Sequence, residues 1–155
     1  MPKRTLEFFV CDVLICINKI ERYTQNIKYS DDFLFEDLIY SATTRELQII
    51  GDAINIILNQ AKSITPQLRQ TWRMVVDFRN FIVHEYFGLN LERVYDIVFT
   101  EIPKLENDVI DFAKNHTDKE ALFIAFQDAK ADAKMCKNID VLGYLEKTER
   151  MIFSS

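Results

Sequence analysis

The sequence predicts an all-α protein, an antiparallel helical bundle of four to five core helices with a C-terminal helical extension. Glycine and proline are scarce, with three of each in 155 residues, which argues against a β-rich fold with many tight turns. Apolar residues recur at three- and four-residue steps, the period of an amphipathic helix. Hydrophobic residues make up 48% of the chain, enough for a sizeable core.

The first half of the chain predicts two long helices separated by a polar break. The first covers residues 5–27 and carries an apolar stripe formed by Leu6, Phe9, Val10, Val13, Leu14, Ile17 and Ile20. Ser30 or Asp31 is a candidate N-cap for a short helical turn over residues 32–35. A long helix is then expected over residues 37–61, with a polar face formed by Arg45, Gln48, Asp52, Asn55 and Asn59.

The second half predicts two further core helices. Thr65 as cap and Pro66 at the first helical position begin a helix that covers about residues 67–86. Gly88 stands where a helix C-terminus favours glycine. Asn90 is expected to cap the next helix, which Pro103 should kink or restart, because proline lacks the backbone N–H.

The pattern divides the chain into a helical-bundle domain at residues 1–115 and an extension at residues 116–155. In the extension, Thr117 and Glu120 form a capping-box pattern that predicts a helix to about Lys137. A last helix is expected from Asp140 to Phe153.

Net charge and cysteine content limit the functions that the sequence allows. The net charge is −5, so any contact with nucleic acid must come from a local basic patch. The three cysteines match no zinc or redox spacing, and they indicate reduced thiols in a cytoplasmic protein. Asp12 interrupts the apolar run near the N-terminus, which argues against a signal peptide, and no uncharged stretch is long enough for a membrane span.

The segment RNFIVHEY, Arg79 to Tyr86, is the candidate site. It keeps an arginine and a histidine inside an apolar helical run, where both are costly to bury unless paired. Histidine titrates near neutral pH, and arginine offers a fixed fork of donors to phosphate oxygens. Together they suit metal-independent cleavage of RNA, with Asn80 as a further donor. The alternative is a structural ion pair or a capping group.

Helical geometry separates the two side chains. Five residues turn the helix by about 500°, which leaves His84 roughly 140° around the axis from Arg79. Either the helix loosens toward Gly88, or a two-fold dimer brings a second copy of both groups to one cleft. The dimer is favoured, because acid and base roles require two groups and each chain has one histidine here. Arg69 and Arg73, one turn apart, are either solvated or positioned to hold a phosphate backbone.

No metal or cofactor is expected. HEYFG at residues 84–88 lacks the second histidine of a zinc helix motif, and there is no Glu-x-x-His pair for a di-iron bundle. The only other histidine, His116, falls in an expected loop.

At RNFIVHEY the chain resembles the HEPN superfamily, whose ribonucleases share an Arg-x(4–6)-His motif, and its His-x-Tyr extension resembles the HepT-like toxins. TRELQIIGDA at residues 44–53 and the block at residues 71–98 resemble two recurring segments of that family. The likeness covers about residues 5–113, with Gln48 and Asp52 at positions where the family usually has Glu, and Tyr95 where it has Trp.

The resemblance implies a toxin of a type VII-like toxin–antitoxin system that dimerises through the motif helices. It implies RNA cleavage by Arg79 and His84, with Asn80 in support, and neutralisation by AMP transfer to Tyr86. Arg73 is the further candidate for RNA binding, from its charge and spacing. The implied partner is a minimal nucleotidyltransferase antitoxin (MntA-like), in a hetero-oligomer with the dimer. Two alternatives remain: a non-catalytic helical partner that positions substrate for the transferase, and a scaffold that binds through residues 116–155.

Overall fold

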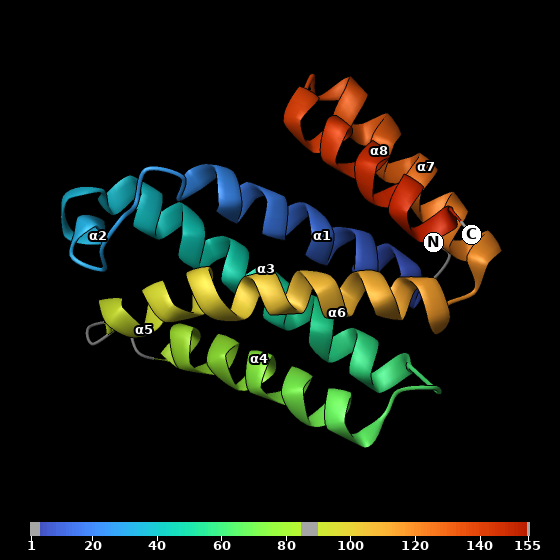
Figure 1. The fold of residues 1–155 in the computed structure, drawn as a ribbon, viewed down its shortest axis with the longest axis horizontal. Coiled ribbons are helices and arrows are strands. Elements are labelled where there is room, and N and C mark those ends of the chain that lie inside the picture. Colours follow the sequence, from blue (N-terminus) through green and yellow to red (C-terminus); the bar gives the residue numbers. More distant parts are fainter. Residues whose placement is uncertain (1–3, 85–89, 155) are drawn as a thin grey trace.

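The structure is a computed structural model that describes residues 4–84 and 90–154; the side chain of His84 lies outside this description. Within these ranges the chain is helical and has no strand, which confirms the predicted all-α class. Figure 1 shows the long helices running side by side with a hairpin at one end. The elements in order are α1 (Leu6–Tyr23), α2 (Asp32–Phe35), α3 (Asp37–Gln60), α4 (Pro66–His84), α5 (Leu91–Asp96), a π-helical turn η1 (Ile97–Glu101), α6 (Ile102–Asn115), α7 (Lys119–Met135) and α8 (Ile139–Phe153).

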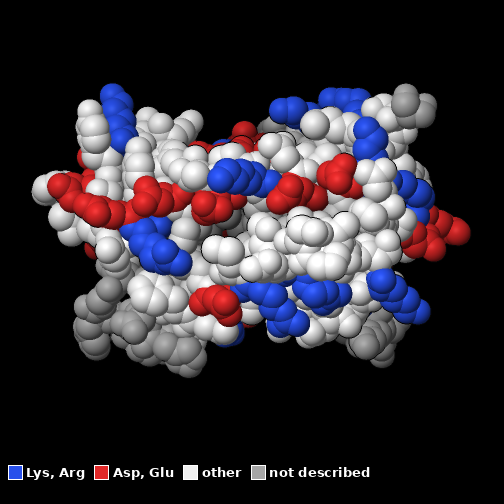
Figure 2. Space-filling view, turned by 60° about the horizontal axis from the view of Figure 1, so that its bottom comes forward, with Lys and Arg blue, Asp and Glu red and all other residues white. Residues whose placement is uncertain are grey.

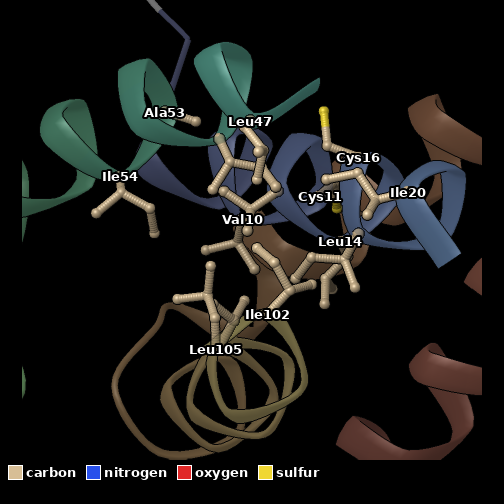
Figure 3. Packing of buried hydrophobic residues seen from close by; sticks show 14 of the residues in the cluster. Val10, Cys11, Leu14, Cys16, Ile20, Leu47, Ala53, Ile54, Ile102 and Leu105 are labelled. Carbon is tan, nitrogen blue, oxygen red and sulfur yellow. The ribbon is translucent and has the colours of Figure 1, made fainter. Parts of the chain in front are cut away.

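The core lies where α1, α3 and α6 meet. Side chains from the three helices point toward one another in Figure 3, among them Val10, Leu14, Ile20, Leu47, Ala53, Ile54, Ile102 and Leu105. The stripe predicted for the first helix is largely the buried one, since Val10, Val13 and Leu14 are fully buried. Removal of this apolar surface from water is the main force that holds the bundle together.

The first helix ends earlier than its sequence predicts. The Thr24 hydroxyl donates to the carbonyl of Ile20, and the backbone N–H of Ile27 bonds back to the carbonyl of Thr24. Ile27 is buried by this turn rather than by a helix. Ile27 lies at helical spacing from the apolar stripe, which is why the sequence predicts a helix about one turn longer than α1.

The irregularity predicted at Pro103 is present as a π-helical turn within a continuous helical run from Leu91 to Asn115. Asn90 caps α5, with its side-chain oxygen accepting from the N–H groups of Glu92 and Arg93. The chain then widens into η1, where the N–H of Ile102 bonds to the carbonyl of Ile97. The wider turn precedes a proline that has no N–H to offer to the usual helical acceptor.

The hairpin α7–α8 packs on α1 and α6 (Figure 1). The predicted capping box at Thr117 is wrong. Asp118 is the cap instead, because its carboxylate accepts from the N–H of Ala121 while Thr117 donates to the carbonyl of Ala113. Among the described residues, no helix is both long and apolar enough to cross a membrane.

Candidate functional site

The site is built on a tight approach between α3 and α4. A Cβ atom added to Gly51 on α3 would lie 2.2 Å from the Cβ of Arg79 and 2.6 Å from its Cγ. No side chain larger than hydrogen fits there without movement of the helices. Gly51 therefore lets the Arg79 stem cross directly over the backbone of α3, which fixes where the guanidinium begins.

Two oxygen atoms then hold the guanidinium. The Nε of Arg79 lies 2.6 Å from Oδ1 of Asp52, the residue after Gly51. This contact is a close ion pair rather than a well-directed hydrogen bond. Nη1 of Arg79 donates to Oδ1 of Asn80 at 3.0 Å. The side chain of Arg79 is 30% exposed and that of Asp52 is 54% exposed, so the pair sits at the surface.

This arrangement can present arginine to an anion. A guanidinium has five N–H donors in a rigid planar fork, and Asp52 and Asn80 engage only part of it. The remaining donors suit phosphate oxygens, which accept paired hydrogen bonds from arginine. Asn80 is exposed, and its amide nitrogen is a further donor beside the arginine.

The structure brings some of the predicted site residues together and not others. Arg79 and Asn80 are in contact, whereas Arg73 is exposed on α4 about 120° around the axis from Arg79. His84 is the last residue of α4, and its side chain is outside the described residues. Tyr86 lies outside the described residues as well.

The course of α4 bears on one alternative left open by the sequence, as far as His84. The helix stays α-helical from Pro66 to His84, so it does not loosen between Arg79 and His84. The angular separation of roughly 140° between these positions therefore stands for one chain.

Arg69 contacts the C-terminal end of α3. Its Nη1 donates to the carbonyl of Leu58 at 3.0 Å, in the last turn of α3. That carbonyl has no intrahelical partner, so a cation here satisfies it and complements the helix dipole. One donor of Arg69 therefore stabilises the end of α3, and the alternative that Arg69 and Arg73 hold a phosphate backbone stays a prediction.

One residue on the polar face of the long helix belongs to the site, and sequence reasoning did not single it out. Asp52 is the ion-pair partner of Arg79. The available signal was Gly51. A glycine inside a helix lowers helix stability, so its presence indicates that another segment of the chain packs closely there. The sequence could not say which side chain would cross it.

Other features around the site are a groove and a charge pattern. A groove of about 520 Å³ lies between α4 and the α5–α6 segment, lined by apolar residues such as Val75, Phe78 and Leu105. Figure 2, which turns the lower side of Figure 1 forward, shows acidic residues in a band and basic residues in a row below it. The positive charge on this face is therefore local rather than spread over the whole surface.

Neither His116 nor the acidic residues of the described chain form a metal site. His116 Nδ1 lies 3.0 Å from Oγ of Ser63, and its ring stacks on Phe112, so it ties the α3–α4 turn to α6. In residues 4–84 and 90–154, no three His, Cys, Asp or Glu side chains gather where they could hold a metal ion.

Comparison with known proteins identifies the family. Residues 13–112 match the family model described as HepT-like, "Ribonuclease HepT-like". "Putative RNase MJ1380" of Methanocaldococcus jannaschii is 32% identical over 109 residues, 70% of this chain and 97% of that protein. "Probable ribonuclease HepT" of Thermococcus cleftensis is 32% identical over 104 residues, 67% of this chain and 92% of that protein. No solved structure gives a significant match. Because the family model matches residues 13–112 and two relatives are 32% identical, the chain belongs to the HepT-like ribonuclease family.

Proposed function

We propose that this ribonuclease is the toxin of a type VII-like toxin–antitoxin system and that it cleaves RNA internally without a metal ion. Arg79 and His84 are the catalytic pair, and Asn80 and Arg73 support RNA binding. The observation that carries the proposal is the surface guanidinium of Arg79, held by Asp52 and Asn80 five residues before a histidine. Arginine stabilises the charge that develops on phosphorus, and histidine moves the proton.

The proposed active form is a two-fold dimer. In one chain the positions of Arg79 and His84 are roughly 140° apart around a regular helix. Cleavage needs a base for the 2′-hydroxyl and an acid for the leaving oxygen, and a symmetric interface supplies two histidines. Helix α4 suits such an interface, because it packs mainly on α3 and leaves much of its surface, including Met74 and Asp77, exposed.

The proposed regulation is AMP transfer to Tyr86 by a minimal nucleotidyltransferase antitoxin. Tyr86 stands seven residues after Arg79, close to two turns of an α-helix in sequence spacing. An AMP group adds bulk and negative charge, which compete with an RNA phosphate for a nearby guanidinium. Mass spectrometry of protein co-expressed with the transferase tests this step, and unmodified Tyr86 peptide in an inhibited complex would refute it.

The cleavage test uses pure protein, labelled RNA and excess EDTA. Arg79→Ala should lower the rate by about 10²–10³-fold, the usual cost of removing one donor from a charge-stabilising site. Arg79→Lys should restore little, because lysine cannot offer the planar fork. His84→Ala should abolish the pH-dependent step. Arg150→Ala on α8 is the matched control, an exposed arginine on another helix that should leave cleavage unchanged.

Two outcomes would overturn the assignment. Full cleavage by both Arg79→Ala and His84→Ala would show that the catalytic pair is elsewhere. No cleavage by the wild-type chain, together with stable binding to the transferase, would favour the non-catalytic partner that positions substrate. The acidic net charge of −5 gives that alternative its physical basis, because phosphate binding draws on cations.

A further inference from the structure

An unusual patch of apolar and acidic side chains stands at the end of the bundle that carries α2 (Figure 1). Its apolar members are among the most exposed large hydrophobic side chains of the described residues, and they stand together in one segment. Phe35 is 84% exposed, Leu38 80%, Tyr29 72% and Leu34 63%. They fall within ten residues of sequence, together with the exposed carboxylates of Asp31, Glu36 and Asp37. We call these seven residues the end patch.

The end patch is held in place by its neighbours rather than left loose. Phe33, inside the same segment, is buried and packs edge-on against Tyr40 with ring centroids 5.5 Å apart. The carboxylate of Asp32 accepts from the N–H groups of Lys28 and Tyr29 at 2.8 and 3.0 Å, and these bonds lower the pKa of Asp32.

A second anchor comes from α5. The hydroxyl of Tyr95, on α5, donates to the carbonyl of Lys28 at 2.8 Å. The segment is thus fastened to both α3 and α5 while its apolar side chains point outward. A backbone segment that is held in place before binding loses little further freedom when a partner binds, which is the property of a preorganised docking surface.

The charge of the segment selects the class of occupant. Residues 28–38 carry four carboxylates and one lysine. Such a surface repels RNA phosphates and anionic lipid headgroups. It also disfavours a two-fold contact with itself, because identical acidic patches would face each other. A protein surface with basic residues around an apolar hollow is complementary to it.

We propose that the end patch is the docking surface for a protein partner of that chemistry, with Phe35 and Leu38 as apolar anchors and Glu36 as a charged rim contact. Large side chains that enter a partner's pocket carry most of the binding energy, and rim charges set approach rate and salt dependence. The identity of the partner rests on the proposed function, which supplies the nucleotidyltransferase as the protein to test. The surface itself is independent of the cleavage chemistry.

The experiment measures the affinity of the full chain for the purified nucleotidyltransferase by calorimetry or interferometry. Phe35→Ser combined with Leu38→Ser should weaken binding by at least about 100-fold, as loss of two anchors does. Glu36→Lys should weaken it by about tenfold at low salt and less at high salt. The matched control is Met135→Ser with Ile139→Ser, whose side chains are 83% and 81% exposed on the opposite hairpin. It should bind as the wild type does.

Binding affinity, RNA cleavage, sedimentation and circular dichroism together keep the outcomes distinct. Equal binding by the Phe35/Leu38 variant and the wild type overturns the docking surface and leaves the proposed function standing. If the wild-type chain does not bind the nucleotidyltransferase, both the proposed partner and the docking surface are wrong. RNA cleavage by the same protein tests the proposed function independently. Conversion of the Phe35/Leu38 variant from dimer to monomer in sedimentation would make a second copy of this chain the occupant and overturn the proposal. Unchanged circular dichroism and RNA cleavage exclude misfolding as the cause of lost binding.

Discussion

Replacement of Gly51 by alanine tests the packing that positions Arg79. The new Cβ would lie 2.2 Å from the Cβ of Arg79 and 2.6 Å from its Cγ, whereas carbon atoms in contact stay about 3.5–4.0 Å apart. The Cβ of Arg79 is fixed to its backbone, so no side-chain rotation relieves the first contact. Helices α3 and α4 must therefore separate by more than an ångström, on the order of 1–2 Å, if contact distances are to be restored.

The expected magnitude combines two opposing effects. Overpacking of this kind costs about 1–3 kcal/mol, and the upper end applies because both atoms lie close to the backbone. Alanine in place of glycine inside a helix contributes about 0.5–1 kcal/mol in the other direction. The net expectation for Gly51→Ala is a loss of about 2–2.5 kcal/mol in the free energy of unfolding.

Gly143→Ala is the control that isolates the clash. Gly143 lies inside α8, and a Cβ there would meet nothing within 4 Å. This variant should gain the helix-propensity term alone, about 0.5–1 kcal/mol. Denaturant unfolding of the two variants and the wild type at equal protein concentration measures the difference. In thermal unfolding, each kcal/mol should shift the midpoint by about 2–4 °C for a chain of this size.

A clear result would refute the reasoning. If Gly51→Ala is as stable as Gly143→Ala, the close approach of α3 and α4 at Arg79 is wrong. If Gly51→Ala is less stable but cleaves RNA at the wild-type rate, the exact placement of Arg79 does not matter to the reaction. The proposed mechanism requires both effects, since a shift of about 1 Å in a positioned group can cost 10²-fold in rate.

Three further predictions concern other groups. Asp52→Asn should lower the cleavage rate by about tenfold, because Arg79 would be less firmly oriented. It should change the free energy of unfolding by no more than about 1 kcal/mol, because surface ion pairs contribute little. A wild-type rate in steady-state kinetics would contradict this prediction. The pKa of Glu21 is raised to about 7 by burial and by the neighbouring Glu106 carboxylate, above its ordinary 4.5. The folded state therefore binds this proton more tightly, so stability should fall as pH rises from 4.5 to 7, and Glu21→Gln should flatten that slope in unfolding titrations. Cys136 is exposed while the other two thiols are buried with raised pKa values, so a thiol reagent should label one cysteine quickly in the native protein and three after unfolding.

Local signals in the sequence were enough for much of the fold. Asn90 caps α5 because its side-chain oxygen reaches two free N–H groups, and this depends only on neighbouring residues. Thr65 likewise accepts from the N–H of Leu68 at the start of α4. Where two caps stood side by side, the sequence was ambiguous. Thr117 matched the capping pattern, but its hydroxyl is engaged by the carbonyl of Ala113, and Asp118 caps instead.

The sequence by itself determined the helical class, the family and the Arg79–His84 motif, because periodicity, caps and motif spacing are properties of residues close together in the chain. Only the tertiary structure decided that Asp52 pairs with Arg79, that Arg69 caps α3, and that Phe35 and Leu38 stay exposed. The physical reason is that each of these facts depends on which residues of distant segments meet when α3 packs against its neighbours. The sequence of a carboxylate, an arginine or an apolar pair does not reveal whether another residue contacts it in the folded protein.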